Sequence, residues 1–469
     1  MRSYFRRLWL ERSDLGAPVQ GSACLPAYSY KLSIPVSPIL QDCKNSKKGL
    51  KLNNLIHFLP SKTDFCTMKK ISIGLLREGK VPPDHRVPLI PEHCAQLLQQ
   101  YDQLEILVQP SSIRCIPDIE YTNAGCIVQE DLSNCDMLMG VKEVPIDQLI
   151  PDKTYLFFSH TIKKQAYNRG LLQAMLKKHI RMIDYEVMTF ENGKRAVAFG
   201  HFAGVVGTHN GLRAYGMRTG AFSIKPAHAC KDYAELRSLY TGINLPPLKI
   251  TVTGTGRVGA GALEMLHLAG VKPVTIEEFL FQSFDEAVFV ELRSKDMYRH
   301  KHNRPFESSH FHTFPGEYVS IFEPFTSVTD LLINTIYWDP SAPVFFSKDD
   351  MKSADFSIKT IADITCDIDG SIPSTIRSSS IDNPFYGYDP LTALETTPFS
   401  AGVIDVMAVD NLPCELPKDA SREFSYNLIQ YVMDQLITTP NSAMINRATI
   451  CIDGKLSSKF EYLEDYIAV

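Results

Sequence analysis

The stretch Gly254-Thr255-Gly256-Arg257-Val258-Gly259 decides the fold class of this chain. It follows the apolar run Leu248–Val252, which is typical of a buried strand, and it opens the helix-like stretch Ala260–Ala269. A Gly-x-Gly-x-x-Gly turn between a strand and a helix is typical of dinucleotide-binding domains, in which the helix N-terminus faces the pyrophosphate. The sequence therefore predicts an α/β domain that binds a nucleotide at this turn.

Each glycine of this turn has its own expected task. Gly254 makes the tight turn, Gly256 lets backbone N–H groups approach the pyrophosphate, and Gly259 lets the helix pack against the strand. The intervening Arg257 and Val258 are expected to contact the nucleotide as well. The alternative interpretation is a glycine-rich turn without a ligand, and the strand–turn–helix context favours nucleotide binding over it.

Composition excludes several other classes of function. The chain has 469 residues, 44% of them hydrophobic, which is enough for two or three ordinary domain cores. A net charge of -5 without a basic tract gives no electrostatic case for nucleic acid, and no apolar run is long enough to span a membrane. The eleven cysteines show no Cys-x-x-Cys pair, so we expect reduced thiols and no metal site.

Residues 1–68 differ in character from the rest of the chain. Arginines are frequent at the start, but Glu11 and Asp14 are unusual in a mitochondrial presequence. We therefore expect an extension without stable structure, with the folded chain beginning near Met68 and a cytoplasmic location. A targeting segment, which would imply the mitochondrial matrix, is the alternative.

The order of apolar runs predicts two Rossmann-like α/β domains with a cleft between them. Residues 69–203 alternate short strands with helical patterns and form the expected substrate domain. Residues 204–410 form the expected dinucleotide domain, with a connecting helix near its start and a His- and aromatic-rich insertion at 292–318. Residues 411–469 are expected to be helical and to pack back on the first domain.

The first domain carries the candidate catalytic groups. Lys142 follows the predicted strand Met137–Val141, and His160 follows the predicted strand Thr154–Ser159. Open α/β sheets bind ligands at the carboxyl ends of their strands, where both side chains would lie. Strand-end lysines and histidines are also common without a catalytic role, so the positions alone leave both interpretations open.

Cations and carboxylates surround these two positions in the sequence. Arginine near a strand end suits bidentate capture of a carboxylate, although a solvated basic loop is the simpler interpretation. The candidate residues for substrate binding are Arg77, Lys80, Arg86, Glu143 and Glu186, and Arg195 is a candidate for cofactor binding.

With these residues and their flanking motifs, the chain resembles the lysine-ketoglutarate reductase and saccharopine dehydrogenase (L-lysine-forming) family. The similarity is greatest to the reductase half of bifunctional aminoadipate semialdehyde synthases, and alanine dehydrogenase and transhydrogenase share the architecture more distantly. The matching motifs span Ile71 to about Leu436 and include Arg77-Glu78, Gly140-Val141-Lys142, Phe157–Lys163, Ile183–Glu186, Val197–Gly200, Ile336-Tyr337-Trp338, Asp363-Ile364 and Asp410-Asn411-Leu412-Pro413.

The resemblance implies a reversible reaction in which L-lysine and 2-oxoglutarate condense to an imine that a nicotinamide cofactor reduces to saccharopine. It assigns deprotonation of the secondary amine to Lys142 and activation of water to His160, with Glu143 and Glu186 tuning this pair. The three cations of the first domain would then clamp substrate carboxylates. Groups that titrate near neutrality suit these proton transfers.

The cofactor is predicted to be NAD or NADP, and the sequence leaves the choice open. Glu277 falls near the position from which a carboxylate binds the ribose 2′-hydroxyl and rejects a 2′-phosphate. Arg257 or a basic residue of the insertion could instead receive that phosphate. By resemblance, Ile336, Tyr337, Asp363 and Asp410 are expected on the nicotinamide side.

Two other functions remain as alternatives. An alanine-dehydrogenase-like enzyme would use the same architecture and the same Lys/His pair, but the fuller motif matches favour the saccharopine family. A non-catalytic regulatory homologue is the second alternative, and the presence of both Lys142 and His160 argues against it. Because few residues follow Leu436, we expect a separate enzyme to exchange saccharopine with this one.

Overall fold

The computed structural model describes residues 70–468. The predicted extension or targeting segment at 1–68 therefore lies outside the described residues. Within the described part, none of the helices is both long and apolar enough to cross a bilayer.

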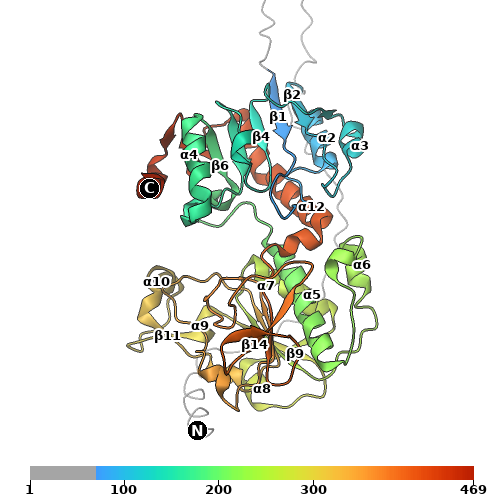
Figure 1. The fold of residues 1–469 in the computed structure, drawn as a ribbon, viewed down its shortest axis with the longest axis vertical. Helices are drawn as coiled ribbons and strands as arrows, with labels where there is room; N and C mark the ends of the chain where they lie inside the picture. Colours follow the sequence, from blue (N-terminus) through green and yellow to red (C-terminus); the bar gives the residue numbers. More distant parts are fainter. Residues whose placement is uncertain (1–69, 469) are drawn as a thin grey trace, which may run out of the picture. The chain divides into compact units, whose positions relative to one another are not determined.

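The first sheet has eight strands in the order β18-β17-β6-β5-β4-β1-β2-β3 (Figure 1). Strands β1 to β6 pair in parallel, which gives the doubly wound order 3-2-1-4-5-6. The strand order reverses between β1 and β4, so a ligand crevice is expected at their carboxyl ends. The bounds are β1 (Ile71–Leu75), β2 (Leu104–Val108), β3 (Ile127–Val128), β4 (Met137–Met139), β5 (Thr154–Phe157), β6 (Arg181–Asp184), β17 (Thr449–Ile452) and β18 (Lys455–Leu456).

Helices cover this sheet and bury the apolar side chains of its strands. α2 begins at Pro91, where the missing N–H of proline leaves no helix hydrogen bond unmade. Its buried face carries Cys94 and Leu97, which belong to the same core as Ile73 and Leu75. The helices of this part are α2 (Pro91–Gln100), α3 (Asp118–Asn123), α4 (Arg169–Lys177), α14 (Ala443–Ala448) and α15 (Glu464–Ala468).

The second sheet also has eight strands, in the order β15-β14-β16-β13-β12-β7-β9-β8. The strand before the glycine-rich turn, β7, is paired in parallel with β9 on one side and β12 on the other. The strand bounds are β7 (Lys249–Thr253), β8 (Lys272–Pro273), β9 (Val288–Leu292), β12 (Leu331–Asn334), β13 (Thr360–Asp363), β14 (Phe385–Asp389), β15 (Leu394–Thr396) and β16 (Ile404–Met407).

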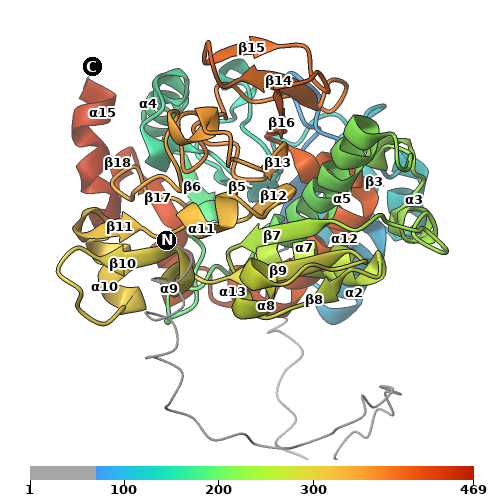
Figure 2. The same ribbon diagram turned by 90° about the horizontal axis from the view of Figure 1, so that it is seen from below.

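The helix that follows the glycine-rich turn packs closely on a second helix. They are α5 (Gly200–Thr219), the predicted connecting helix, and α7 (Arg257–Leu268), which follows the turn (Figure 2). A Cβ added to Gly204 would lie 1.9 Å from the carbonyl oxygen of Val258, and one on Gly261 would lie 2.1 Å from that of His201. Only glycine allows these backbones to approach so closely, so α5 fixes the start of α7.

The predicted insertion lies between β9 and β12 in the chain. It contains α9 (Ser294–Met297), an antiparallel pair of β10 (Tyr298–His300) and β11 (Tyr318–Ser320), and α10 (Ser308–Thr313). Its aromatic side chains belong to the core of the second sheet, which also includes Phe279 from α8 (Ile276–Phe281) and Phe325 from α11 (Glu323–Thr326).

The C-terminal segment returns to the first sheet, as predicted. α12 (Pro417–Leu428) lies on the loop before α2, where the Ser421 hydroxyl accepts a hydrogen bond from the Val87 N–H at 2.9 Å. α12 continues through a π-helical turn (Ile429–Met433) into α13 (Asp434–Thr438). Beyond the helices, β17 pairs antiparallel with β6, so the segment also adds two strands that the sequence did not predict. The predicted fold class of two Rossmann-like sheets is confirmed.

Candidate functional site

The loops after β1 and β4 are joined by one partly buried carboxyl group. Glu78 accepts hydrogen bonds from the Val141 N–H at 2.6 Å and the Lys142 N–H at 2.9 Å. Burial, followed by the nearby Asp84 carboxylate, raises the pKa of Glu78 to about 8. Glu78 therefore fixes the backbone that carries Lys142 at the point where the strand order reverses.

Lys142 is partly buried among charged side chains at this edge of the sheet. Burial is the main cause that lowers its pKa, and the positive charges of Arg86 and Lys80 lower it further. A lysine whose pKa is lowered in this way has more of the neutral amine at neutral pH. The environment thus favours a lysine that accepts a proton.

Glu143 lies between a histidine and a lysine. One carboxylate oxygen, Oε1, is 2.6 Å from Nδ1 of His160, and the other, Oε2, is 3.1 Å from Nζ of Lys80. Burial raises the pKa of Glu143, but the hydrogen bond and the charge of His160 outweigh it, so the pKa falls to about 2. The carboxylate therefore orients the His160 ring and leaves its Nε2 for proton exchange.

The backbone of His160 adopts a left-handed conformation, with φ of 52°. Residues other than glycine rarely adopt this region, and it recurs at functional sites because the surrounding structure must hold it there. Here it turns the chain directly after β5 so that the ring of His160 meets Glu143.

Glu186 belongs to a separate ion-pair group after β6. Its Oε1 is 2.9 Å from Nη2 of Arg195 and 3.5 Å from Nζ of Lys163. Arg195 also accepts a hydrogen bond on its backbone carbonyl from the Arg257 guanidinium at 3.1 Å. The structure thus joins Glu186 to the glycine-rich turn through two arginines, and not to the Glu143–His160 pair.

The three cations predicted to clamp carboxylates have different surroundings. Lys80 contacts Glu143, as described above. Arg77 is half-exposed and pairs with Glu130 on the far side of β2. Arg86 is buried, pairs through Nε and Nη2 with Asp84, and lies 4.2 Å above the ring of Phe199.

Arg86 also joins the C-terminal segment to this loop. Its Nη2 donates to Asn411 Oδ1 at 2.7 Å, and the Cys414 thiol donates to Asp84 Oδ1 at 3.7 Å. Despite the cost of burial, the guanidinium beside Asp84 holds the pKa of that carboxyl well below its usual range. Sequence reasoning did not single out Asp84, and it quoted Glu78 in a matching motif without assigning it a role.

A cavity of ≈ 830 Å³ lies at the glycine-rich turn of the second sheet. α7 begins there with Gly256 as its N-cap and no side chain capping its free N–H groups. A Cβ added to Gly256 would meet no atom within 4 Å, so it would project into open space beside these N–H groups. The cavity is lined by Arg195, Gly254, Thr255, Gly256, Arg257, Val258, Arg293, Ser294, Lys295, Thr335, Ile336, Tyr337, Trp338, Asp339 and Ala342, and by residues of the insertion.

These features fit a bound dinucleotide. α7 has twelve residues and an uncapped N-terminus, and Gly256 leaves open space beside it. Four cationic side chains line the same cavity. Together these features suit a polyanion. Gly259 has the packing contact expected of the third glycine, because a Cβ there would lie 2.3 Å from the Gly254 carbonyl oxygen.

The structure does not place Glu277 at this cavity. The strand beside β7 is β9, whereas Glu277 is exposed in the first turn of α8, which lies earlier in the chain. In Rossmann-like sheets the ribose 2′-position is read at the carboxyl end of the strand beside the fingerprint strand. The residues that follow β9 are Arg293, Ser294 and Lys295. The sequence had offered a basic residue of the insertion as an alternative to Glu277 without naming which one, because the chain places β8 and α8 before β9.

The four residues expected on the nicotinamide side divide into two pairs. Ile336 and Tyr337 follow β12 and line the cavity. Asp363 is buried at the end of β13, where its oxygens accept hydrogen bonds from Asn334, Thr365 and Thr375. Asp410 is exposed after β16, and neither aspartate lines the cavity.

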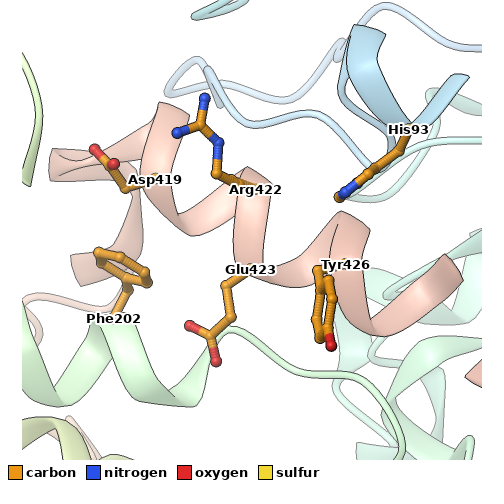
Figure 3. A pocket seen from close by; sticks show the side chains of 6 residues that line it. All are labelled: His93, Phe202, Asp419, Arg422, Glu423 and Tyr426. Atoms are coloured by element: carbon orange, nitrogen blue, oxygen red, sulfur yellow. The ribbon is translucent and has the colours of Figure 1, made fainter. Parts of the chain in front are cut away.

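A second hollow, of ≈ 410 Å³, lies against α12 (Figure 3). Its side chains come from α2, α5 and α12, with Arg422 and Glu423 pointing in different directions. It holds none of the residues predicted for catalysis or cofactor binding. The lining residues are His93, Phe202, Asp419, Arg422, Glu423 and Tyr426.

Comparison with known proteins agrees with this architecture. Residues 74–206 match the alanine dehydrogenase/PNT N-terminal domain family. The solved structure of an L-alanine dehydrogenase covers 85% of this chain with a TM-score of 0.58 and 17% identity, and a transhydrogenase from Sinorhizobium meliloti covers 82% with a TM-score of 0.51 and 14% identity. These two likenesses establish the fold.

Curated relatives are more similar in sequence. The chain is 30% identical over 440 residues to α-aminoadipic semialdehyde synthase of Arabidopsis thaliana, and 31% identical over 447 residues to the mitochondrial enzyme of Bos taurus. These matches cover 83% and 84% of this chain but 41% and 48% of the relatives, so the chain spans about half their length. The NAD(+), L-lysine-forming saccharopine dehydrogenase of Yarrowia lipolytica is 24% identical, and 96% of its length is covered. The resemblance expected from the motifs is confirmed, and the chain is a homologue of the α-aminoadipic semialdehyde synthases and saccharopine dehydrogenases, built on the alanine dehydrogenase fold.

Proposed function

We propose that the chain is an NAD(P)-dependent oxidoreductase acting on the CH–NH group of saccharopine, which it interconverts with L-lysine and 2-oxoglutarate. The observation that carries the proposal is the placement of Lys142 and the Glu143–His160 pair where the strand order of the first sheet reverses. The same chain has a cavity suited to a dinucleotide, and Arg195, in the segment between β6 and α5, lines it. A nicotinamide bound there supplies or accepts the hydride.

Lys142 and His160 have different proton-transfer roles in this proposal. The lowered pKa of Lys142 favours a neutral amine, which takes the proton from the secondary amine of saccharopine through Nζ. His160, oriented through Nδ1 by Glu143, then uses Nε2 to take a proton from the water that attacks the imine. In the reverse direction the same atoms return these protons.

Lys80 is the best-placed of the three proposed carboxylate clamps. It lies 3.1 Å from Glu143, and its charge both balances that carboxylate and attracts an anionic substrate to the site. Arg86 has Nε and Nη2 engaged by Asp84 and Asn411, which leaves Nη1 for a substrate carboxylate. We assign Arg77, paired with Glu130, a weaker electrostatic contribution.

We further propose that the cofactor is NADP. Arg293, Ser294 and Lys295 follow β9, where the ribose is expected, and all three line the cavity. A 2′-phosphate is recognised by arginine and lysine, whereas NAD selection uses a carboxylate at this position. The NAD-dependent relatives are the more distant ones in sequence, which is consistent with a different choice here.

The function is tested by adding L-lysine and 2-oxoglutarate to the purified chain with NADPH or NADH and following nicotinamide absorbance. We expect oxidation of the cofactor that requires both substrates, and a loss of about 10²–10⁴-fold in turnover for Lys142→Met with unchanged cofactor binding. Lys177→Met, which alters an exposed lysine at the end of α4, is the control. Turnover with pyruvate and ammonium instead would indicate alanine dehydrogenase chemistry, and near-normal turnover of Lys142→Met would reject its role.

The cofactor choice is tested separately by binding. Arg293→Ala and Lys295→Ala each remove a charge-assisted contact worth about 1.5–3 kcal/mol. Each should therefore raise the Kd for NADPH by about 10- to 150-fold and leave the Kd for NADH almost unchanged. Lys301→Ala, an exposed lysine of the insertion that does not line the cavity, is the matched control. Equal losses for both cofactors would contradict a 2′-phosphate site.

Two finer features belong to the same proposal. The chain would exchange saccharopine with a separate enzyme, and L-lysine, 2-oxoglutarate and saccharopine would be its small-molecule partners. Relatives from Bos taurus and other mammals are named mitochondrial, so the matrix stands beside the cytoplasm as a proposed location.

A further inference from the structure

We infer that the insertion forms the adenine subsite of the cofactor cavity, with Phe306, Phe311 and His312 as its wall. The inference rests on the proposed function, because it assigns these side chains to the adenosine half of a nicotinamide dinucleotide. The strand order of the second sheet is the first support for this inference. β9 lies beside β7 on the side opposite β12, and adenosine extends over the strand in the position of β9.

The chain that leaves β9 runs from the ribose position directly into the insertion. Tyr298, the first residue of β10, stands three positions after Lys295, and both line the cavity. The distal wall is therefore continuous with the residues expected to bind the ribose phosphate. Beyond Lys295, the insertion residues that line the cavity are Tyr298, Phe306, Ser308, Phe311, His312 and Pro315.

This wall has the chemistry of an adenine site. The rings of Tyr298 and Phe311 stack with centroids 4.7 Å apart, and Phe306 lies 5.6 Å from Phe311. Aromatic faces suit a flat, apolar purine ring, and base stacking on aromatic side chains is a common source of affinity. The exposed Ser308 and His312 add polar groups at the rim, which suit the polar edge of the base.

A hydrogen-bonded group holds this wall together from behind. His300 is buried in β10, and its Nε2 is 3.2 Å from Glu317 Oε2. His310 of α10 lies between the Tyr318 hydroxyl, 3.0 Å from Nδ1, and the same Glu317 oxygen, 3.8 Å from Nε2. These contacts tie α10 to both strands, so the aromatic wall is preorganised.

The convergence of two histidines and a glutamate also resembles a metal site, but the proton positions oppose it. The His302 N–H donates to Nδ1 of His300 at 3.0 Å, so the proton of the neutral ring stands on Nε2. Nε2 would have to lose that proton to bind a metal, whereas it can donate it to Glu317 directly. The group is thus a hydrogen-bonded support for the wall.

The test compares the binding of whole dinucleotides with that of a nicotinamide mononucleotide, on matched variants. Phe306→Ala and His312→Ala remove side chains that line the cavity, and Phe314→Ala and His302→Ala remove the same side chains from exposed positions of the insertion that do not. The probes are NADPH and NADH, measured by calorimetry, and reduced nicotinamide mononucleotide, which lacks adenosine, measured by saturation-transfer NMR.

For the dinucleotide that binds to wild type, we expect Phe306→Ala to raise the Kd by about 5- to 150-fold. His312→Ala should raise it less. Mononucleotide binding and both control variants should match wild type. Equal dinucleotide affinity in Phe306→Ala and wild type would overturn the inference, as would losses shared with Phe314→Ala or with the mononucleotide. Wild-type protein that binds neither dinucleotide would instead reject the proposed function itself.

Discussion

At the scale of single residues, the candidate active site depends on two partly buried carboxyl groups that differ in charge. Glu143 has its pKa held at about 2 by His160, whereas burial raises that of Glu78 to about 8. At neutral pH one is therefore an anion beside His160, and the other is mostly a neutral acid behind Lys142. The Asp84 and Glu143 carboxylates already favour the protonated lysine, and a neutral Glu78 adds no further negative charge beside it.

Glu78 should make the stability of the chain depend on pH. Its pKa is raised from 4.5 to about 8 on folding, so the folded state keeps a proton that the unfolded chain has lost. This contribution is complete below about pH 4.5 and is lost as the pH rises to about 8. The Tm of wild type should therefore fall by several °C more than the Tm of Glu78→Gln between pH 6 and pH 9. The control is Glu191→Gln, at an exposed position. Parallel curves of Tm against pH for wild type and Glu78→Gln would contradict the assignment.

At the scale of elements, the position of the nucleotide turn depends on the contact between α5 and α7. The helices meet through Gly204 and Gly261, whose missing side chains let carbonyl oxygens approach where a Cβ would stand. α7 presents its N-terminus to the cavity, so any shift of α7 against α5 moves the free N–H groups. Helix packing and nucleotide binding are therefore coupled here.

Gly204→Ala should show this coupling directly. The new Cβ would meet the Val258 carbonyl at 1.9 Å, so the helices must separate at a cost of about 1–3 kcal/mol or more. We expect a lower Tm together with a raised Kd for NADPH. Gly170→Ala in α4, whose Cβ would make an ordinary 3.5 Å contact with Ile146, should preserve both. A destabilised Gly204→Ala with normal affinity would show that the two properties are independent.

At the scale of the whole molecule, the substrate side is completed by distant parts of the chain. Val87 and Ile90 donate their backbone N–H groups to Ser421 and Ser425, across 334 and 335 residues of sequence. The neighbouring Arg86 contacts Asn411 across 325 residues. The loop that carries Arg86 is thus held by the C-terminal segment, whereas the nucleotide turn is held by α5.

Removing both serine hydroxyls should affect the two halves differently. In Ser421→Ala/Ser425→Ala, two buried N–H groups lose their acceptors, at about 1–3 kcal/mol each. We expect a lower Tm and a raised KM for 2-oxoglutarate, with the Kd for NADPH unchanged, measured by calorimetry and steady-state kinetics. Ser327→Ala, at an exposed position, is the control. A KM equal to that of wild type would show that α12 does not set the substrate loop.

Local sequence determined the two α/β sheets, the glycine-rich turn and the strand ends that carry Lys142 and His160. These features follow from runs of neighbouring residues, because apolar periodicity and glycine act within one strand or one turn. The resemblance added the expected chemistry of these residues, and the sequence alone left NAD and NADP open.

Only the tertiary structure decided which strand lies beside β7 and which residues complete the site. Counting along the chain led to Glu277, but the sheet order places β9 there and brings Arg293 and Lys295 to the cavity. The contacts of Arg86 with Asp84 and Asn411 and the pairing of β17 with β6 likewise required the folded chain. Strand order and burial are set by packing between segments hundreds of residues apart, and no local pattern encodes them.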